Sequence, residues 1–597
     1  MKIYHLKSII VLFVFAMNYS KLCAQITDDE LDRQITQSLE NSGSAEGEDE
    51  ALNDLAIEFQ ELLKHPVNIN SSNETGLLKV PGMTVLMANS IILHRKKYGN
   101  FLSLYELQAV AGIDFQLLKE VIKYLSVGDN PSSKITFPTL ILEGRNELWL
   151  ISGRRLQESA GYKSIKGKDL AYKGNPYRMA MRYRYSFSNR LLISFSGEKD
   201  AGEQFLKGSN KYGFDFNSFN LTLKNTGRLK MLVIGDFQSA FGQGLTFGTA
   251  AGFGKSANVQ NVKRNANGLR PFRSFTESGF MRGIGAGFKL NNKLMLTSFV
   301  SYKKSDATIH EDTLGDYFTS ISVSGYHRTE NEIKSKNSSG EMILGSNLSY
   351  DLSKFHLGFT AVSKTYSNKK VKNPDLYRLF DSQGKNNTSF GADYHFLVAN
   401  ILAFGEISAN GFNKSVSYIN GMVISLDKTF DIAIVNRNYS VQYSPVSSNA
   451  FSEAGSGTNE KGTYIGASLN AGKGVTLNAY YDIFRFPWLK YRIAAPSQGN
   501  DVLFECRYSE RKKFAVYTRY RREQKMQDLS VSPGSVKVQE SVCRRTFRVH
   551  LESKISDIIS IHSRIESSFY SGNNKSSKGI FLFQDFVYSG LKKTTVT

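Results

Sequence analysis

Residues 177–185 read Tyr177-Arg178-Met179-Ala180-Met181-Arg182-Tyr183-Arg184-Tyr185. Large apolar and aromatic side chains alternate with small or basic ones, so a β-strand here would have one apolar face and one strongly basic face. The core between two packed sheets would not tolerate three such arginines, whereas the water-filled interior of a barrel would. The stretch therefore predicts a strand of a large barrel, with Arg178, Arg182 and Arg184 forming a basic stripe on its inner surface.

The connections between the predicted strands point to the same fold. Short turns are expected at 188–189, 225–227, 291–292, 353–354, 427–429 and 472–474. Much longer loops fall between them, near 153–175, 199–213, 238–279, 303–340, 364–388 and 440–461. A strict alternation of short and long connections is typical of outer-membrane barrels, with the short turns periplasmic and the long loops outside the cell. Counted this way, residues 141–588 hold about twenty strands.

The composition agrees with a barrel of many strands. The chain has 40 Phe, 30 Tyr and 49 Gly but only 11 Pro, a mixture that suits aromatic strands separated by glycine-containing turns. After removal of the first 24 residues, Cys506 and Cys543 are the two remaining cysteines. They fall on different predicted strands, so no disulfide framework is inferred.

The N-terminus has the pattern of an export signal, which we place at residues 1–24. Lys2 and Lys7 precede a short apolar core, and Ala24 offers a small residue before a cut that leaves Gln25 first. The apolar core is too short for a membrane-spanning helix, which needs about 20 apolar residues. A lipoprotein reading through Cys23 is the alternative, although Leu22 is bulky where lipid attachment favours a small residue.

Charge is distributed unevenly along the chain. The formal net charge is +21, yet residues 25–63 contain twelve acidic residues and one basic residue, Arg33. Residues 25–50 therefore form an acidic, flexible lead, and the rest of the chain is strongly basic. A basic body favours anionic partners such as nucleic acid, lipopolysaccharide or phosphorylated solutes. The alternative is that barrel rims near anionic lipid are simply rich in lysine and arginine.

Residues 51–128 have helical periodicity and contain two short hairpins. A first helix is expected from Ala51 until His65-Pro66 stops it. The first hairpin is Val80-Pro81-Gly82-Met83-Thr84, followed by a helix over 85–98, and the second is Val110-Ala111-Gly112-Ile113-Asp114. Ser103 and Glu106 form a capping box that starts another helix between the hairpins. Residues 129–140 are a linker, and the barrel occupies 141–597.

The two-hairpin spacing from Val67 to about Val127 resembles the tandem helix-hairpin-helix domain of competence-type DNA receptors. In DNA-binding versions, a glycine–hydrophobic–glycine core lets backbone N–H groups approach a phosphate. Here Thr84 and Asp114 replace the second glycines, and both are good N-cap residues, so a structural or protein-docking role is the alternative to DNA binding. The resemblance implies phosphate contacts from Gly82, Met83, Thr84, Gly112, Ile113, Arg95, Lys96 and Lys97.

The loop over 238–279 is the second basic feature of the predicted barrel. Five glycines between 242 and 254 make it pliable, and its basic residues include Lys255, Lys263, Arg264 and Arg270. A loop of this size can fold into the lumen and constrict it, which would create an anion-selective eyelet. The alternative is an exposed adhesive or disordered loop.

No pattern for catalysis stands out. Residues 249–256 resemble a phosphate-binding loop, but Thr249 stands where the first glycine belongs and no strand leads into a helix there. His356 and His395 lie on consecutive predicted strands without metal-ligand spacing, and we interpret them as lumen residues in contact with water. We therefore expect no enzyme, no cofactor and no bound metal.

The end of the sequence leaves closure of the barrel open. Such barrels commonly finish on a strand with a terminal aromatic residue, which the insertion machinery recognises. Here residues 589–593 look like a turn after Tyr588, and residues 594–597 look like the start of another strand. We expect either a disordered extension or, slightly favoured, a chain that is shorter than its full-length form.

The whole chain resembles a family of Bacteroidetes-type exported proteins that join a helix-hairpin-helix region to a large barrel. The residues that carry this resemblance are 102–109, 198–203, 235–238, 241–245, 263–271 and 486–492. Members of this family continue past the point where this sequence stops. The resemblance implies an outer-membrane location but no established activity.

Three functions follow as hypotheses. The first is a non-enzymatic barrel that binds or passes a polar or anionic ligand, while its helical domain docks a periplasmic partner. The second is a DNA-uptake or DNA-binding role through the hairpins, and the third is a component of envelope assembly. The expected surroundings are outer-membrane lipid, lipopolysaccharide and the barrel insertion machinery.

Overall fold

The computed structural model describes residues 62–63, 66–110, 113, 118, 121–128 and 137–596. Short gaps in this description fall at 164–169, 188–189, 250–254, 265–267, 314, 353, 412–413, 456, 511–513, 530–536, 557–558, 573–574 and 592–593. The predicted signal peptide and acidic lead lie outside the described residues. So do Gly112 and Asp114 of the second hairpin.

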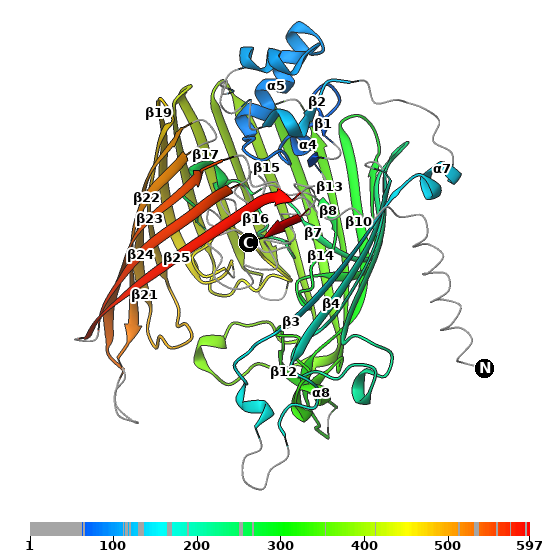
Figure 1. Cartoon of the computed structure of the whole chain (residues 1–597). Coiled ribbons are helices and arrows are strands. Elements are labelled where there is room, and N and C mark those ends of the chain that lie inside the picture. The colour runs from blue at the N-terminus through cyan, green and yellow to red at the C-terminus, as the bar shows by residue number, and fades with distance from the viewer. Residues whose placement is uncertain are drawn as a thin grey trace.

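A large antiparallel barrel forms most of the molecule (Figure 1). Twenty strands of nine to seventeen residues make up its wall in the described part of the chain, which confirms the predicted fold class. They are β3 (Arg145–Arg154), β4 (Tyr177–Phe187), β5 (Leu191–Lys199), β6 (Phe216–Thr226), β7 (Leu229–Ala240), β9 (Met281–Lys289), β10 (Leu294–Ser305), β13 (Ser339–Asp351), β14 (Phe355–Lys370), β15 (Gly384–Val398), β16 (Ile401–Asn410), β17 (Val416–Asp427), β18 (Phe430–Tyr439), β19 (Glu460–Gly472), β20 (Val475–Phe486), β21 (Ser497–Glu510), β22 (Phe514–Asp528), β23 (Gln539–Lys554), β24 (Ile559–Gly572) and β25 (Lys575–Leu591). The strand order is a closed ring in which the short strand β26 (Thr594–Val596) stands between β25 and β3.

The outer face of the barrel is apolar. Side chains on one face of each strand alternate with those on the other, and the outward set includes many large hydrophobic residues that stay exposed. Examples are Leu150, Ile234, Val300, Leu344, Phe359, Phe390, Ile407, Ile465, Ile483, Phe504, Phe547 and Ile565. A water-soluble monomer rarely exposes so continuous an apolar surface, so this wall suits contact with lipid.

The two ends of the barrel differ, as the spacing of turns predicts. Short turns join β4 to β5, β6 to β7, β9 to β10, β13 to β14, β17 to β18 and β19 to β20. Long connections that carry β12 and α8 gather at the opposite end (Figure 1), whereas the connection that carries η5 and β8 folds back into the barrel. The long connections contain small elements of their own. These are η3 (Ala160–Tyr162), η4 (Gly208–Asn210), η5 (Val259–Val262), β8 (Gly268–Pro271), β11 (Ala307–His310), β12 (Tyr317–Ile321), α8 (Glu330–Ser335) and η6 (Leu376–Arg378).

The first barrel strand begins at Arg145 rather than at Ile141, because a short helix, α7 (Phe137–Leu142), precedes it. Tyr185 of β4 fixes the end of this helix. Its hydroxyl donates to the carbonyl of Leu140 at 2.7 Å and accepts from the backbone N–H of Gly144 at 2.9 Å. A side chain at Gly144 would collide with the Tyr185 ring, so glycine allows the close approach.

The N-terminal helical domain lies at the end of the barrel that carries the short turns (Figure 1). It contains α4 (Glu74–Leu77), α5 (Val85–Tyr98), η1 (Leu104–Ala109) and η2 (Ile122–Tyr124), and the parallel pair β1 (Val67–Asn68) and β2 (Leu125–Ser126) joins its two ends. The predicted capping box of Ser103 and Glu106 is present, but it starts a 3₁₀ helix. None of the helices in the described part of the chain is long and apolar enough to cross a membrane.

Candidate functional site

The basic stripe predicted on β4 faces the interior of the barrel. Arg182 and Arg184 are both buried, and their neighbours on β3 and β5 are residues of the same inner face: Trp149 and Glu147 on β3, and Ser194 on β5. Arg178, one step nearer the long loops, pairs with Glu198 at 2.6 Å. Strand alternation therefore carries the three arginines to the lumen side, as the sequence predicts.

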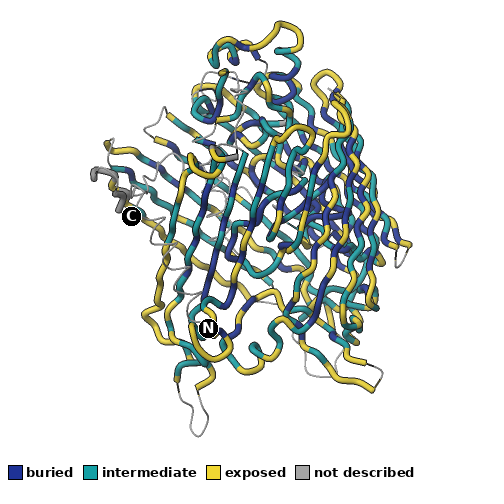
Figure 2. Tube along the Cα trace, turned by 90° about the vertical axis from the view of Figure 1, so that its right-hand side faces the viewer, coloured by how far each residue is buried: buried dark blue, intermediate teal, exposed yellow. Residues whose placement is uncertain are grey.

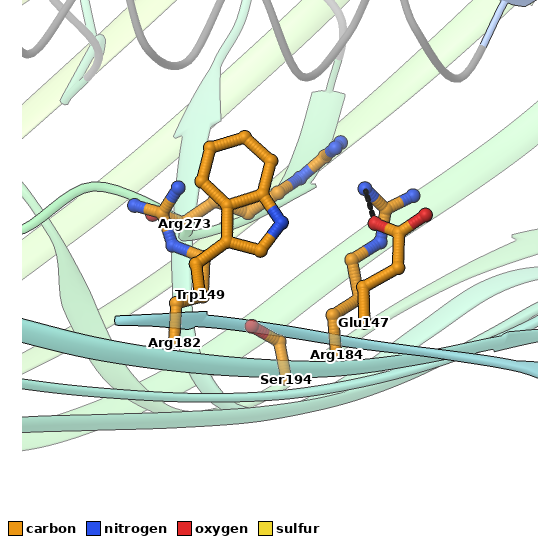
Figure 3. Close-up of a pocket in the computed structure, with 6 residues that line it drawn as sticks. All are labelled: Glu147, Trp149, Arg182, Arg184, Ser194 and Arg273. Atoms are coloured by element: carbon orange, nitrogen blue, oxygen red, sulfur yellow. Dashed lines mark hydrogen bonds and ion pairs between the residues drawn. The ribbon is translucent and has the colours of Figure 1, made fainter. Parts of the chain in front are cut away.

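A narrow pocket gathers three guanidinium groups around this stripe (Figure 3). The guanidinium of Arg182 lies 4.5 Å from the Phe275 ring centre and donates to the backbone carbonyl of Arg273. Arg184 lies 3.8 Å from the single carboxylate, Glu147. Residues lining the pocket are Glu147, Trp149, Arg182, Arg184, Ser194 and Arg273. The cavity has a volume of about 10 Å³, which is room for about one water. Its excess of guanidinium groups therefore contributes a positive field at the lumen wall.

The long loop between β7 and β8 fills one half of the lumen. We call residues 241–264 the plug loop. Leu245, Ala257, Val259 and Val262 of this loop are buried in one cluster with inward side chains of β16–β21. The members of the cluster on the wall include Phe404, Ile419, Val435, Tyr464, Tyr480 and Leu503. The predicted folding of this loop into the lumen is thus what the structure shows, although its role as an eyelet stays a prediction.

Carboxylates on the barrel wall hold the plug loop in place. The side chain of Glu406 on β16 accepts backbone N–H groups from Gln243, Leu245 and Thr246 at 2.6, 3.0 and 2.7 Å. The turn that aims these three N–H groups at one carboxylate has positive φ at Gly242 and Gly244, which glycine adopts without strain. The loop is therefore anchored by its backbone as well as by its apolar side chains.

The predicted cationic residues of this loop are paired with carboxylates. The ammonium of Lys255 is 4% exposed and lies 2.6 Å from Asp482 and 3.2 Å from Asp501, with Glu453 also in contact. Burial alone would lower the pKa of Lys255, yet the three carboxylates raise it above its ordinary value. Lys263 lies 3.5 Å from Glu74. These two lysines stabilise the plug and present little unpaired charge to a solute.

Arg264 and Arg270, the other two candidate eyelet residues, follow at the end of the plug loop. The backbone N–H of Arg264 donates to the Gln243 side chain at 3.0 Å, and burial lowers the pKa of Arg264 to about 10. Arg270 belongs to β8, which pairs with β7. The eyelet role of these four residues stays a prediction.

The other half of the lumen stays accessible. Inward residues of β16–β21 such as Phe404, Tyr464 and Asp482 are almost completely buried, because the plug loop covers them. The inward faces of β23–β25 differ: Arg544, Phe581 and Phe583 are exposed. Figure 2 shows the same contrast, with the strands near the C-terminus coloured mostly teal and yellow. The accessible inner surface therefore lies along β23–β25, whereas Arg182 and Arg184 of β4 are buried.

Further arginines line this accessible half. Strand pairing places Arg544, Arg548 and Arg564 on the same inward face of β23 and β24. Arg548 pairs with Glu566 at 2.6 Å. These three arginines were not among the predicted site residues, although the arginine-rich pattern of residues 544–548 is the signal that would have found the first two.

The helical domain packs on the plug loop from the short-turn end. Leu78, Leu86 and Leu93, on α4 and α5, contact the cluster that the plug loop forms with the wall. Glu74 at the start of α4 lies 3.5 Å from Lys263 and 3.6 Å from His395 of β15. Burial opposes the charge of Glu74, yet Lys263 and His395 hold its pKa well below the ordinary value.

The hairpin residues that we predicted to contact phosphate have mainly structural roles. Thr84 caps α5 by accepting the backbone N–H of Met87 at 3.2 Å. Arg95 donates to the carbonyls of Ile69 and Ser72 at 2.8 and 2.7 Å. Met83 and Ile113 are buried in the domain core, Gly82 has φ of +80°, and Lys96 and Lys97 are exposed. DNA binding by this domain stays a prediction.

His356 of β14 and His395 of β15 are in contact. His356 and His395 stack with ring centres 4.8 Å apart, and His356 bonds to Asp351 and Asp393 at 2.6 and 3.0 Å. His395 faces Glu74. The pair therefore connects the wall to the helical domain. Cys506 and Cys543 are both free thiols, in line with the absence of an inferred disulfide.

Comparison with known proteins gives one motif and a set of distant barrels. The family model described as "Helix-hairpin-helix motif" matches residues 64–126. Among solved structures, Pseudomonas aeruginosa OpdQ matches with 10% identity and a TM-score of 0.28, over 74% of this chain and 96% of OpdQ. The anion-selective porin from Comamonas acidovorans matches with 11% identity and a TM-score of 0.23, over 59% of this chain and 80% of the porin.

Pseudomonas aeruginosa OccK1 (OpdK) also matches, with 8% identity and a TM-score of 0.27, over 69% of this chain and 92% of OccK1. No curated protein matches the sequence. At TM-scores this low the superpositions are poor, so the description of the barrel rests on the strand pairing of this chain.

Proposed function

We propose that the chain is an outer-membrane barrel that binds or passes an anionic solute, and that it does so without enzymatic chemistry. In this proposal the solute travels along the accessible half of the lumen, past the arginines of β23 and β24 and the pocket on β4. The helical domain lies on the periplasmic side, and the long loops face the outside of the cell. The observation that carries the proposal is that Arg182, Arg184 and Arg273 line one pocket together with a single carboxylate, Glu147.

The electrostatic argument has two parts. The carboxylates of the filled half neutralise Lys255 and Lys263, so the plug loop adds little net field. The accessible half keeps arginines on its inner face, and a low-dielectric wall concentrates their field along the path. An anion is therefore favoured over a cation at the same position. Apolar residues on the outer face supply the surface for lipid.

The plug loop and the helical domain together obstruct part of the lumen. Together they occupy the half of the lumen bounded by β16–β21 and the mouth above it. We propose that a periplasmic protein docks on the helical domain. Because Glu74 of this domain contacts Lys263 of the plug loop, docking would transmit movement of the domain to the plug loop.

Ion selectivity of the purified barrel in planar bilayers tests the proposal. Under a salt gradient we expect a reversal potential of anion-selective sign for the full chain. The variant Arg544→Gln, at an exposed lumen position, should move it toward cations, and Arg182→Gln with Arg184→Gln should move it further. The control Arg228→Gln removes an exposed arginine at a short turn and should leave it near the parent value.

Two outcomes would contradict the proposal. A cation-selective barrel whose reversal potential ignores all of these substitutions would exclude the arginines as the determinant. A correctly folded barrel that conducts no ions and binds no anion would favour a component of envelope assembly.

A further inference from the structure

The long-loop end contains a second cavity that the path through the lumen does not include. It has a volume of about 360 Å³ and lies among the β3–β4 loop, the β5–β6 loop and the segment 322–328. This volume is in the range of pockets that hold small organic ligands. Arg178, the outermost member of the β4 stripe, is part of its lining. The cavity therefore opens onto the beginning of the arginine stripe.

Tyrosine rings form the walls of this cavity. The guanidinium of Arg328 lies between two of them, 3.9 Å from the Tyr326 ring centre and 5.1 Å from that of Tyr172. Tyr162 meets Tyr172 edge to face with ring centres 4.9 Å apart. Packed tyrosine rings of this kind are rigid and keep a hydroxyl at one end. They offer flat surfaces together with hydrogen-bonding groups.

The cavity is also basic. Its lining contains Arg154, Arg155, Arg178 and Arg328 against the two carboxylates of Glu158 and Asp200. Glu332 already pairs with Arg328 at 2.9 Å, and Tyr177 accepts from Arg154 at 3.4 Å. Arg155 has no ion pair with any residue in the described part of the chain. Its side chain lines the cavity.

A buried histidine fixes the segment that supplies Tyr326 and Arg328. His327, between them, bonds through Nδ1 to Asp215 at 2.5 Å and through Nε2 to Asp306 at 2.8 Å. Its backbone N–H donates to Glu203 at 2.8 Å. Glu203 and Asp215 belong to the β5–β6 connection, and Asp306 lies at the start of the same β10–β13 connection as His327. The cavity wall is therefore set before a ligand arrives, which reduces the entropic cost of binding.

We propose that this cavity is the capture site for an anionic saccharide at the long-loop face, from which the ligand passes to Arg178 and the β4 stripe. The proposal deepens the function given above and rests on it for the second step only. Tyrosine rings can stack on the C–H face of a pyranose, and their hydroxyls can bond to its hydroxyl groups. Arg155 supplies the partner for a carboxylate, sulfate or phosphate. A simple anion would need the arginine but not the rings.

Binding of an acidic disaccharide to the folded full chain tests the proposal. The probe is a di-uronide, the neutral control is its methyl ester, and inorganic phosphate represents charge without a ring. Isothermal titration or fluorescence in detergent would give the affinities. We expect Arg155→Gln and Tyr172→Ala each to weaken di-uronide binding by about tenfold or more, which is about 1.4 kcal/mol. Tyr212→Ala, at a fully exposed tyrosine of the β5–β6 loop, is the matched control.

Each result decides a different point. Equal affinity for phosphate and di-uronide, or loss of binding only with Arg155→Gln, would overturn the saccharide assignment in favour of a simple anion site. No di-uronide binding by the parent chain would overturn the site altogether. If lipopolysaccharide displaces the di-uronide, the saccharide comes from lipid headgroups, whereas a failure to displace it assigns a free saccharide. Because Arg182→Gln with Arg184→Gln should abolish selective conductance but preserve capture, failure of the pore and failure of the capture site can be told apart.

Discussion

Replacement of Lys255 by methionine should release the plug loop without unfolding the barrel. The ammonium of Lys255 is 4% exposed and contacts Glu453, Asp482 and Asp501. Removal of one partner from a buried ionic cluster costs about 3–5 kcal/mol, because the remaining charges stay buried without compensation. Since Arg437, Arg521 and Lys525 still pair with Asp482, Asp501 and Glu453 respectively, we expect a cost at the lower end, about 3 kcal/mol.

This cost converts into a change that can be measured. Each 1.4 kcal/mol is about a factor of ten in a population, so the open form of the plug loop should become about a hundredfold more populated. Hydrogen exchange of peptides from 241–264 should accelerate accordingly, and single-channel conductance should rise or fluctuate. The control Lys473→Met, at an exposed turn residue, should change neither. Unchanged exchange and unchanged conductance in the Lys255 variant would refute the assignment of the loop as a charge-anchored plug.

Three further predictions concern the helical domain, the long loops and the orientation. Glu74→Gln should weaken docking of the helical domain on the barrel, and so should a fall in pH. Because the pKa of Glu74 is lowered in the folded chain, its contribution to stability is present above about pH 4.5 and lost as the pH falls. Faster hydrogen exchange at Leu86 and Leu93 would show the weaker docking, and an unchanged rate would contradict it. The loop cluster around His327 should weaken as the pH rises. Burial and neighbouring carboxylates raise the pKa of Glu203 to about 7 and that of Glu277 to about 9. Burial alone would lower the pKa of His327, but Asp215 and Asp306 outweigh burial and raise it to about 10. Asp215 and Asp306 have lowered pKa values and stay charged over this range, and Lys336 pairs with Asp215. Proteolysis of these loops should therefore be faster at pH 9 than at pH 6, and equal rates would count against the cluster. A cysteine in place of Lys207 should react with an impermeant reagent on intact cells and one in place of Lys96 should not; the reverse would invert the proposed orientation.

The fold could be predicted because strand alternation is a local signal. The nine residues 177–185 show in order which side chains face the lumen, and short turns such as 472–474 mark where strands reverse. The start of the first strand could not be predicted from the sequence with the same accuracy. The apolar run 137–142 fits a strand or a helix, and it is the contact of Tyr185 with Leu140 and Gly144 that fixes a helix there.

The ion pairs of the plug loop could not be predicted from the sequence. Its lysines looked available to anions because their partners lie far away along the chain: Lys255 pairs with Asp482 and Asp501, and Lys263 with Glu74. No spacing rule connects such positions, since only closure of the barrel brings them together. The same reason hides the role of Arg95, which bonds backbone carbonyls at 69 and 72 rather than a ligand.

The sign of the reversal potential under a salt gradient tests the central claim most directly, because it reports the net field along the accessible half of the lumen. The pocket that gathers Arg182, Arg184 and Arg273 with Glu147, together with Arg544 on the inner face of β23, predicts anion selectivity that Arg544→Gln reduces and Arg228→Gln leaves intact. A cation-selective potential, or one that Arg544→Gln, Arg182→Gln and Arg184→Gln all leave unchanged, would contradict it.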